Sequence, residues 1–249
     1  MRKHVVLFFI SILLRVSPMA AFASTIASGT CGDNLTWTLD SNGVLRISGS
    51  GEMSNFHYDS YEPAVTIPWY SNRSSIKSCV IANGVTSIGD YAFSYCTNLT
   101  SVTIANSVGT IGHSVFLSCS GLQSVTIPSS VTTLKSNVFN YCTSLTNVIL
   151  SENITDIGVN SFGNCTSLTS ITLPSKLQSI KDSLFYQCKN LTNVTIPNSV
   201  DSIWADAFYL CSKLTSITIP DSVTYIPSSH NPFSSCGNGK LQITAETCG

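Results

Sequence analysis

Apolar residues recur along most of the chain with a fixed period of 23 residues. Phenylalanine, cysteine and leucine form three registered series, in which each residue follows the previous type by three positions. The series are Phe93, Phe116, Phe139, Phe162, Phe185 and Phe208; Cys96, Cys119, Cys142, Cys165, Cys188 and Cys211; and Leu99, Leu122, Leu145, Leu168, Leu191 and Leu214. Such a period is typical of a repeat protein whose units stack on one another.

Each unit also contains an alternating apolar pair, which predicts a β-strand. Val102 and Ile104 are two residues apart and therefore face the same side of a strand. Phe93, Cys96 and Leu99 are spaced by three, which suits a helical or 3₁₀ turn on the opposite side of the coil. One unit cannot bury these groups alone, so the pattern predicts stacked coils with a parallel sheet on one face and short helical turns on the other.

The array extends past the six regular units at both ends. Ile76, Cys79 and Ile81 form an atypical coil before the first unit, and Leu241 and Ile243 predict a final strand. About eight stacked strands are expected, and at ~4.8 Å each the sheet would be roughly 35 Å long. The predicted fold class is an α/β solenoid of 23-residue coils, with a parallel sheet on one face and a small β cap at the N-terminus.

Four segments are predicted: 1–23 as a signal peptide, 24–75 as an N-terminal β cap, 76–236 as the solenoid, and 237–249 as a C-terminal cap. The first has basic residues, an apolar stretch over 5–14 and a small-x-small pattern at 21–23, which indicate secretion. Apolar alternation around Ser41-Asn42-Gly43 predicts a β-hairpin in the cap. Caps are expected because an open solenoid end exposes core and strand edges.

The charge pattern narrows the expected partners. Only 10% of residues are charged, and the net charge of the chain is −1. Removal of 1–23 takes away Arg2, Lys3 and Arg15 but no acidic residue, which leaves a formal net charge of −4. No basic patch remains, so neither nucleic acid nor an anionic membrane is an expected partner. No later apolar run approaches the ~20 residues of a membrane-spanning helix.

No motif in the sequence indicates catalysis, so we predict a protein that is not an enzyme and needs no cofactor or metal. His57, His113 and His230 stand in unrelated contexts without cysteines at metal-ligand spacing. Glu52 and Asp59 lie near the aromatic part of the cap, but no second element supports a glycosidase. Nucleophile-elbow, P-loop and dinucleotide-binding patterns are also missing from the sequence.

The cysteine series should lie on adjacent coils. Stacking would bring these residues within disulfide range, but a parallel ladder aims the side chains in one direction. Free, buried thiols that act as small apolar residues are therefore favoured. The pairing of Cys31, Cys79, Cys236 and Cys248 is left open, and a bridge between Cys236 and Cys248 is one alternative in a secreted protein.

Units such as Ile88–Cys96 resemble the BspA-type, or Treponema pallidum-type, leucine-rich repeat. The resemblance covers about 76–236, with mild departures such as Lys135 and Lys181 where other units have glycine. The segment Cys31–Gly51 is similar to the leader that often precedes such repeats. The resemblance implies a secreted or cell-surface protein that binds host matrix proteins or other cells, without identifying the ligand.

Two surfaces are candidate binding sites. The outward side of the sheet is an uncharged face of hydroxyl groups, with candidate partner-binding residues Thr103, Ser124, Thr126, Thr172, Asn193, Thr195 and Thr218. The cap contains Tyr58, Tyr61, Trp69 and Tyr70, which could stack on a sugar. Alternatively these rings seal the end of the core, which is the interpretation we favour.

The functional hypothesis is binding of an extracellular protein or cell-surface ligand through the sheet. The alternative is a carbohydrate-binding or wall-associated structural protein that uses the aromatic cap. A minor alternative is ice or mineral binding by the regular threonine rows.

Overall fold

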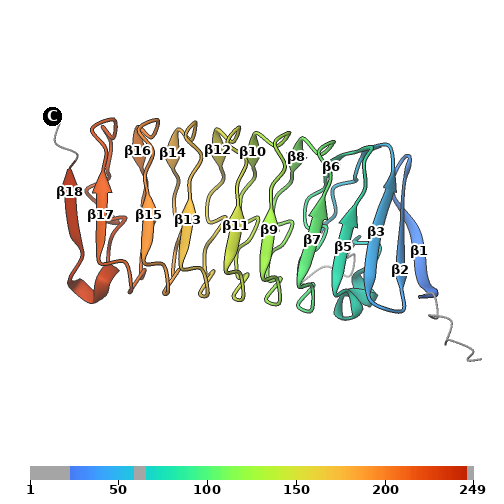
Figure 1. Ribbon diagram of the computed structural model, residues 1–249. Coiled ribbons are helices and arrows are strands. Elements are labelled where there is room, and N and C mark those ends of the chain that lie inside the picture. Colours follow the sequence, from blue (N-terminus) through green and yellow to red (C-terminus); the bar gives the residue numbers. More distant parts are fainter. Residues whose placement is uncertain (1–22, 59–65, 246–249) are drawn as a thin grey trace, which may run out of the picture.

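The computed structural model describes residues 23–58 and 66–245 of the 249-residue chain. Figure 1 shows an elongated solenoid in which the strands of successive coils lie side by side along the long axis. The predicted solenoid of 23-residue coils with a parallel sheet is confirmed. The predicted signal peptide lies outside the described residues, apart from residue 23.

One side of the solenoid holds one strand from each coil. These strands are β5 (Ser78–Ile81), β7 (Ser101–Ile104), β9 (Ser124–Thr126), β11 (Asn147–Ile149), β13 (Ser170–Thr172), β15 (Asn193–Thr195), β17 (Ser216–Ile219) and β18 (Gln242–Ala245). They are parallel and in the expected register, with Val125 opposite Val148 and Ile171 opposite Val194. Hydrogen-bonded pairing is interrupted between β11 and β13 and between β15 and β17.

A second side holds further strands, most of them shorter, which the hydrophobic pattern does not predict. They are β4 (Gly51–Glu52), β6 (Val85–Ile88), β8 (Thr110–Ile111), β10 (Thr133–Leu134), β12 (Asp156–Ile157), β14 (Ser179–Ile180) and β16 (Ser202–Ile203). Among these strands, β4, β6, β8, β10 and β12 pair in one ladder, and β14 and β16 pair in another. The last residue of each strand from β6 onward is a buried Ile or Leu that contributes to the core.

The third side consists of β-turns, where helical turns were predicted. Two residues in each coil, such as Tyr91 and Tyr95, have φ near +60° (58° and 62°), which interrupts any helical run. Their backbone groups pair between coils instead: the Phe93 N–H donates to the Val115 carbonyl at 2.9 Å, and this bond recurs along the solenoid. The turns therefore form a third hydrogen-bonded ladder along the long axis.

Helices are short in the part of the chain that the structure describes. They are two 3₁₀ helices, η1 (Tyr70–Ser75) and η2 (Cys236–Gly239). Neither has the length and apolar content that crossing a membrane requires.

A column of stacked aromatic rings runs through the core. The six phenylalanines of the repeat follow one another at centroid separations of 5.3–5.7 Å and interplanar angles of 4–20°. Trp69 extends the column at one end, 5.6 Å from Phe93, and Phe233 extends it at the other, 5.5 Å from Phe208. Two more residues separate Phe233 from Phe208 than the 23-residue period requires. The ring of Phe233 still stacks in the column, so the loop before it accommodates the two extra residues.

The cysteines of the repeat form a second buried column. The thiol of Cys119 donates to the Phe93 carbonyl of the preceding coil at 3.0 Å, and the same bond recurs up to Cys236 and Phe208. Each thiol therefore supplies a hydrogen bond as well as apolar volume. None of the nine described cysteines is bonded to another of them. Cys248 lies outside the described residues, so its bridge to Cys236 stays a prediction.

The N-terminal cap continues the long sheet. β1 (Thr25–Gly32), β2 (Leu35–Asp40) and β3 (Val44–Gly49) form an antiparallel meander, and β3 pairs in parallel with β5. The predicted hairpin is the β2–β3 pair, with Leu39 opposite Leu45. The hairpin therefore supplies hydrogen-bond partners to the first coil, which would otherwise present an open strand edge.

Replacing Gly43 in the hairpin turn by alanine is expected to destabilise the cap. Gly43 has φ of +84°, and an added Cβ would lie 2.5 Å from the Ser75 carbonyl oxygen. The strain of a left-handed backbone conformation at alanine and this clash together should lower the free energy of unfolding by about 1–3 kcal/mol. Urea unfolding of the Gly43→Ala variant measures the loss. An unchanged midpoint would contradict the turn geometry.

Candidate functional site

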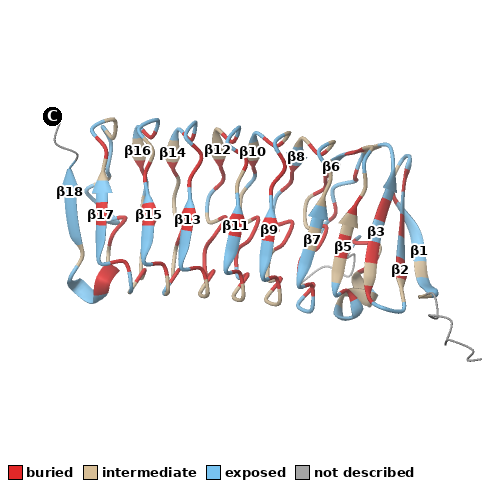
Figure 2. Cartoon of the chain, viewed as in Figure 1, coloured by how far each residue is buried: buried red, intermediate tan, exposed pale blue. Residues whose placement is uncertain are grey.

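The outer face of the long sheet brings the predicted binding residues together. All seven are exposed: Thr103 from β7, Ser124 and Thr126 from β9, Thr172 from β13, Asn193 and Thr195 from β15, and Thr218 from β17. Figure 2 shows exposed positions of neighbouring strands lying side by side along this side of the solenoid. We call this surface the threonine face. The alternation that exposes these residues also buries the valine or isoleucine between them.

Hydroxyl groups on this face fall into two classes. The threonines just before the strands bond to the preceding coil; Thr146 Oγ1, for example, donates to the Gln123 carbonyl at 3.1 Å. Within the described residues, the hydroxyls of Thr103, Thr126, Thr172 and Thr195 have no protein partner. They are therefore available for a ligand or water.

The threonine face is hollowed where the sheet pairing is interrupted. A groove of about 250 Å³ lies between β15 and β17 and is lined by Asn193, Thr195, Ser216 and Thr218. Farther along the face, Ile149 is 53% exposed at a position where β7, β9, β13, β15 and β17 have threonine. Ile149 is not among the predicted binding residues, but its break in the threonine series is visible in the sequence. The groove depends on strand separation and has no such signal.

In the described part of the cap, Trp69 does not contribute to a sugar-stacking surface, which is the second candidate site. Trp69 is fully buried: its ring stacks in the core column, and its Nε1–H donates to the Ala92 carbonyl at 2.8 Å. The prediction that Trp69 belongs to a stacking site is therefore wrong. The first coil needs a large ring to close its core, and Trp69 supplies it. Tyr61 lies outside the described residues.

Two other cap tyrosines remain at the surface. Tyr58 and Tyr70 are half-buried, with ring centroids 5.9 Å apart, and Tyr58 lies 4.6 Å from Tyr95. The Arg73 guanidinium sits 3.9 Å over the Tyr70 ring, so one face of that ring is already occupied. This cluster packs against itself and leaves little aromatic surface for a ligand.

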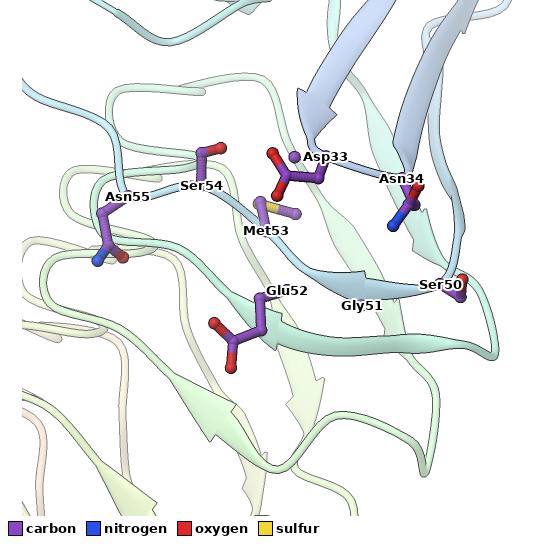
Figure 3. Close-up of a pocket in the computed structure, with 9 residues that line it drawn as sticks. Asp33, Asn34, Ser50, Gly51, Glu52, Met53, Ser54 and Asn55 are labelled. Atoms are coloured by element: carbon purple, nitrogen blue, oxygen red, sulfur yellow. The ribbon is translucent and has the colours of Figure 1, made fainter.

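The cap also contains a polar hollow of about 390 Å³. Figure 3 shows Asp33 and Asn34 on one side and the segment from Ser50 to Asn55 on the other. Asp33 and Glu52 both line this hollow, and both are exposed. No group of three metal-ligating side chains occurs within 23–58 and 66–245.

Comparisons with known proteins agree with this architecture. A family model described as "BspA type Leucine rich repeat region" matches in six copies over residues 68–189 and 133–247. The solved leucine-rich repeat protein of Treponema pallidum is 26% identical, with coverage of 74% of this chain and 90% of that chain and a TM-score of 0.56. No curated protein sequence matches the chain significantly.

Two further solved structures are more distant. A leucine-rich repeat protein from Eubacterium ventriosum is 22% identical, covers 88% of this chain and 72% of that chain, and has a TM-score of 0.49. The pneumococcal vaccine antigen PcpA is 16% identical, with coverages of 89% and 88% and a TM-score of 0.47. Because the family model spans well over half of the sequence, the chain belongs to the BspA-type leucine-rich repeat family.

Proposed function

We propose that the protein is a secreted or cell-surface binding protein, without enzymatic activity, that adheres to matrix proteins or to other cells through the threonine face. The carrying observation is the series of exposed threonines Thr103, Thr126, Thr172 and Thr195, whose hydroxyls have no partner among the described residues. Membership of the BspA-type repeat family supports a binding role. The fully buried position of Trp69 argues against the alternative that places sugar binding in the cap.

The chemistry of the face indicates how such binding would work. The predicted binding residues are all uncharged, so charge steering would contribute little to the association rate. Many weak hydroxyl and methyl contacts would add up over this flat surface. Ile149 would add an apolar contact, and the groove between β15 and β17 would select a partner of matching shape. Without exposed aromatic or arginine anchors among the predicted residues, a single copy should bind weakly, and adhesion would depend on many copies.

Substitution of the threonine face by lysine should weaken this binding strongly. The variant Thr126→Lys, Thr172→Lys, Thr195→Lys places charge on three coils and is expected to weaken saturable binding by more than about tenfold, which is ~1.4 kcal/mol. The measurement is surface plasmon resonance of residues 24–249 against a panel of extracellular matrix proteins, with a binding assay on whole cells alongside.

A control of equal charge tests whether the location matters. Thr86→Lys, Thr110→Lys, Thr132→Lys adds the same side chains at exposed positions on or beside the short strands. This control should bind as the unmodified protein does. Equal binding by both variants would contradict a role for the threonine face, and absence of saturable binding by the unmodified protein would contradict the proposed function.

A further inference from the structure

Two exposed aromatic rings lie together on the side of the solenoid that carries the short strands. Trp204 is 40% exposed and Tyr225 is 45% exposed, and their ring centroids are 4.9 Å apart at an angle of 49°. Both depart from the repeat. Trp204 stands where earlier coils have Gly89, Gly112, Lys135, Gly158 and Lys181, and Tyr225 stands where they have Ser87, Thr110, Thr133, Asp156, Ser179 and Ser202.

The core does not require either ring. The phenylalanine column already fills the interior of these coils. The earlier coils fold with glycine, lysine, serine, threonine or aspartate at the same two positions. The other two tryptophans of the chain, Trp37 and Trp69, are buried. Trp204 is therefore an exposed indole at a position where the fold needs no large side chain.

Hydrogen bonds hold the indole in one orientation. The Nε1–H of Trp204 donates to Ser202 Oγ at 3.2 Å, and the Ser202 hydroxyl donates to Asp201 Oδ1 at 2.7 Å. The backbone N–H of Trp204 donates to the Ile180 carbonyl at 2.8 Å, and the Ile203 N–H donates to the Tyr225 carbonyl at 3.0 Å. The pair is thus preorganised, which reduces the entropy lost when a ligand binds.

The indole borders a cavity of about 450 Å³ that spans several coils. Its lining combines the apolar Val159 and Trp204 with Asp182, Asp201 and Gln178, so hydrogen-bonding groups surround an apolar wall. Lys181 also lines the cavity, but its Nζ lies 2.6 Å from Asp156 Oδ1 and its charge is partnered. The size falls within the range of small-molecule sites, about 300–1,000 Å³.

This combination suits a sugar ring. The apolar C–H face of a hexopyranose can lie against an indole, while its hydroxyls bond to carboxylate and amide groups at the edge. The two carboxylates in the lining, the half-buried Asp182 and the exposed Asp201, disfavour an anionic ligand. We propose that the cavity beside Trp204, whose indole packs against Tyr225, binds a neutral saccharide, such as a β-linked glucose, galactose or N-acetylglucosamine unit. This site is separate from the threonine face and does not depend on the proposed function of that face.

Tryptophan fluorescence of residues 24–249 tests the proposal directly, because Trp204 is the only exposed one of the three tryptophans. Cellotetraose, lactose and chitotetraose are the probes. A binding sugar should shift the emission to the blue and protect it from iodide quenching in a saturable manner. Absence of a saturable change with all three probes would overturn the proposal.

The repeat itself supplies variants that should fold. Tyr225→Thr restores a residue that other coils use, retains the fluorescent Trp204, and is expected to weaken binding by roughly tenfold or more. Trp204→Gly removes the platform and should abolish sugar contacts in saturation-transfer NMR. Tyr141→Asn removes a 50%-exposed tyrosine elsewhere, at a position where the next coil has Asn164, and should leave binding unchanged.

Each outcome separates the two proposed surfaces. Sugar contacts retained by Trp204→Gly would overturn the assignment to this cavity, and undiminished binding by Tyr225→Thr would overturn the role of the ring that packs against the indole. The threonine-face variant Thr126→Lys, Thr172→Lys, Thr195→Lys should keep the full fluorescence response, because its lysines lie on the other sheet. Loss of matrix-protein binding with intact sugar binding would support both sites independently.

Discussion

Raising the pH from about 8 to about 10 is expected to destabilise the solenoid strongly under reducing conditions. Six cysteines of the buried column, Cys79, Cys96, Cys119, Cys142, Cys165 and Cys188, have pKa values raised above the ordinary 9.0, and burial is the main cause. The pKa of Cys96, for example, rises to about 12. Such thiols stay protonated in the folded chain at a pH where they ionise in the unfolded chain.

The sign follows from this difference. A raised pKa means that the thiols contribute their full stabilisation below the unfolded pKa of 9.0 and lose it as the pH rises toward 12. Each thiol should cost about 1.4 kcal/mol per pH unit above that point, so six should cost about 8 kcal/mol per unit. This is comparable with the whole stability of a typical domain, about 5–15 kcal/mol.

Urea unfolding at a series of pH values, with a reductant present, measures this slope. Tyrosines also ionise in this range, so a variant separates the contributions. Cys142→Ala, Cys165→Ala lacks two of these six thiols and should lower the cysteine-dependent slope by about 3 kcal/mol per pH unit. An identical slope in this variant would show that buried thiols do not control the alkaline transition.

Replacing Phe139 by alanine is expected to lower the free energy of unfolding by about 3–5 kcal/mol. Phe139 is fully buried in the middle of the column, 5.4 Å from Phe116 and 5.5 Å from Phe162. Truncation removes both stacking contacts and leaves a cavity between two coils that the hydrogen-bonded ladders hold at fixed spacing. Neighbouring rings cannot close this gap without breaking those ladders.

Ile149→Ala is the matched comparison for this variant. It truncates a large apolar side chain only ten residues away, but that side chain is 53% exposed. Its effect should stay near or below about 0.5 kcal/mol. Urea denaturation followed by circular dichroism compares the two variants. Similar losses in both would indicate that the aromatic column is not the main source of stability in these coils.

The repeat period made most of the long sheet predictable. Because every 23rd residue has the same environment, the register of Val125 against Val148 follows from the spacing alone. The eight expected strands match the eight parallel strands on the long side of the solenoid: β5, β7, β9, β11, β13, β15, β17 and β18. The short strands were missed because most contain only two residues, and a lone Ile111 after Thr110 shows no alternation.

The turns and parts of the candidate sites carry weaker signals. Spacing by three fits both a 3₁₀ turn and a series of β-turns, and left-handed residues such as Tyr91 or Leu210 are not of the types that mark such positions. The sequence also does not show on which side of the chain a ring lies, so Trp69 could be read as core or as surface. The groove between β15 and β17 depends on strand separation, which no residue type signals.

The hydrogen bonds that join successive coils on all three sides have a mechanical consequence. All of them run along the long axis, so a pulling force applied to the two ends would load the bonds of the terminal coil first. Coils would then peel away one after another, and each would release up to about 75–80 Å of extended chain. If one end were anchored and the other end were bound to a partner, the protein would lengthen in steps under tension and so limit the force on the bound partner.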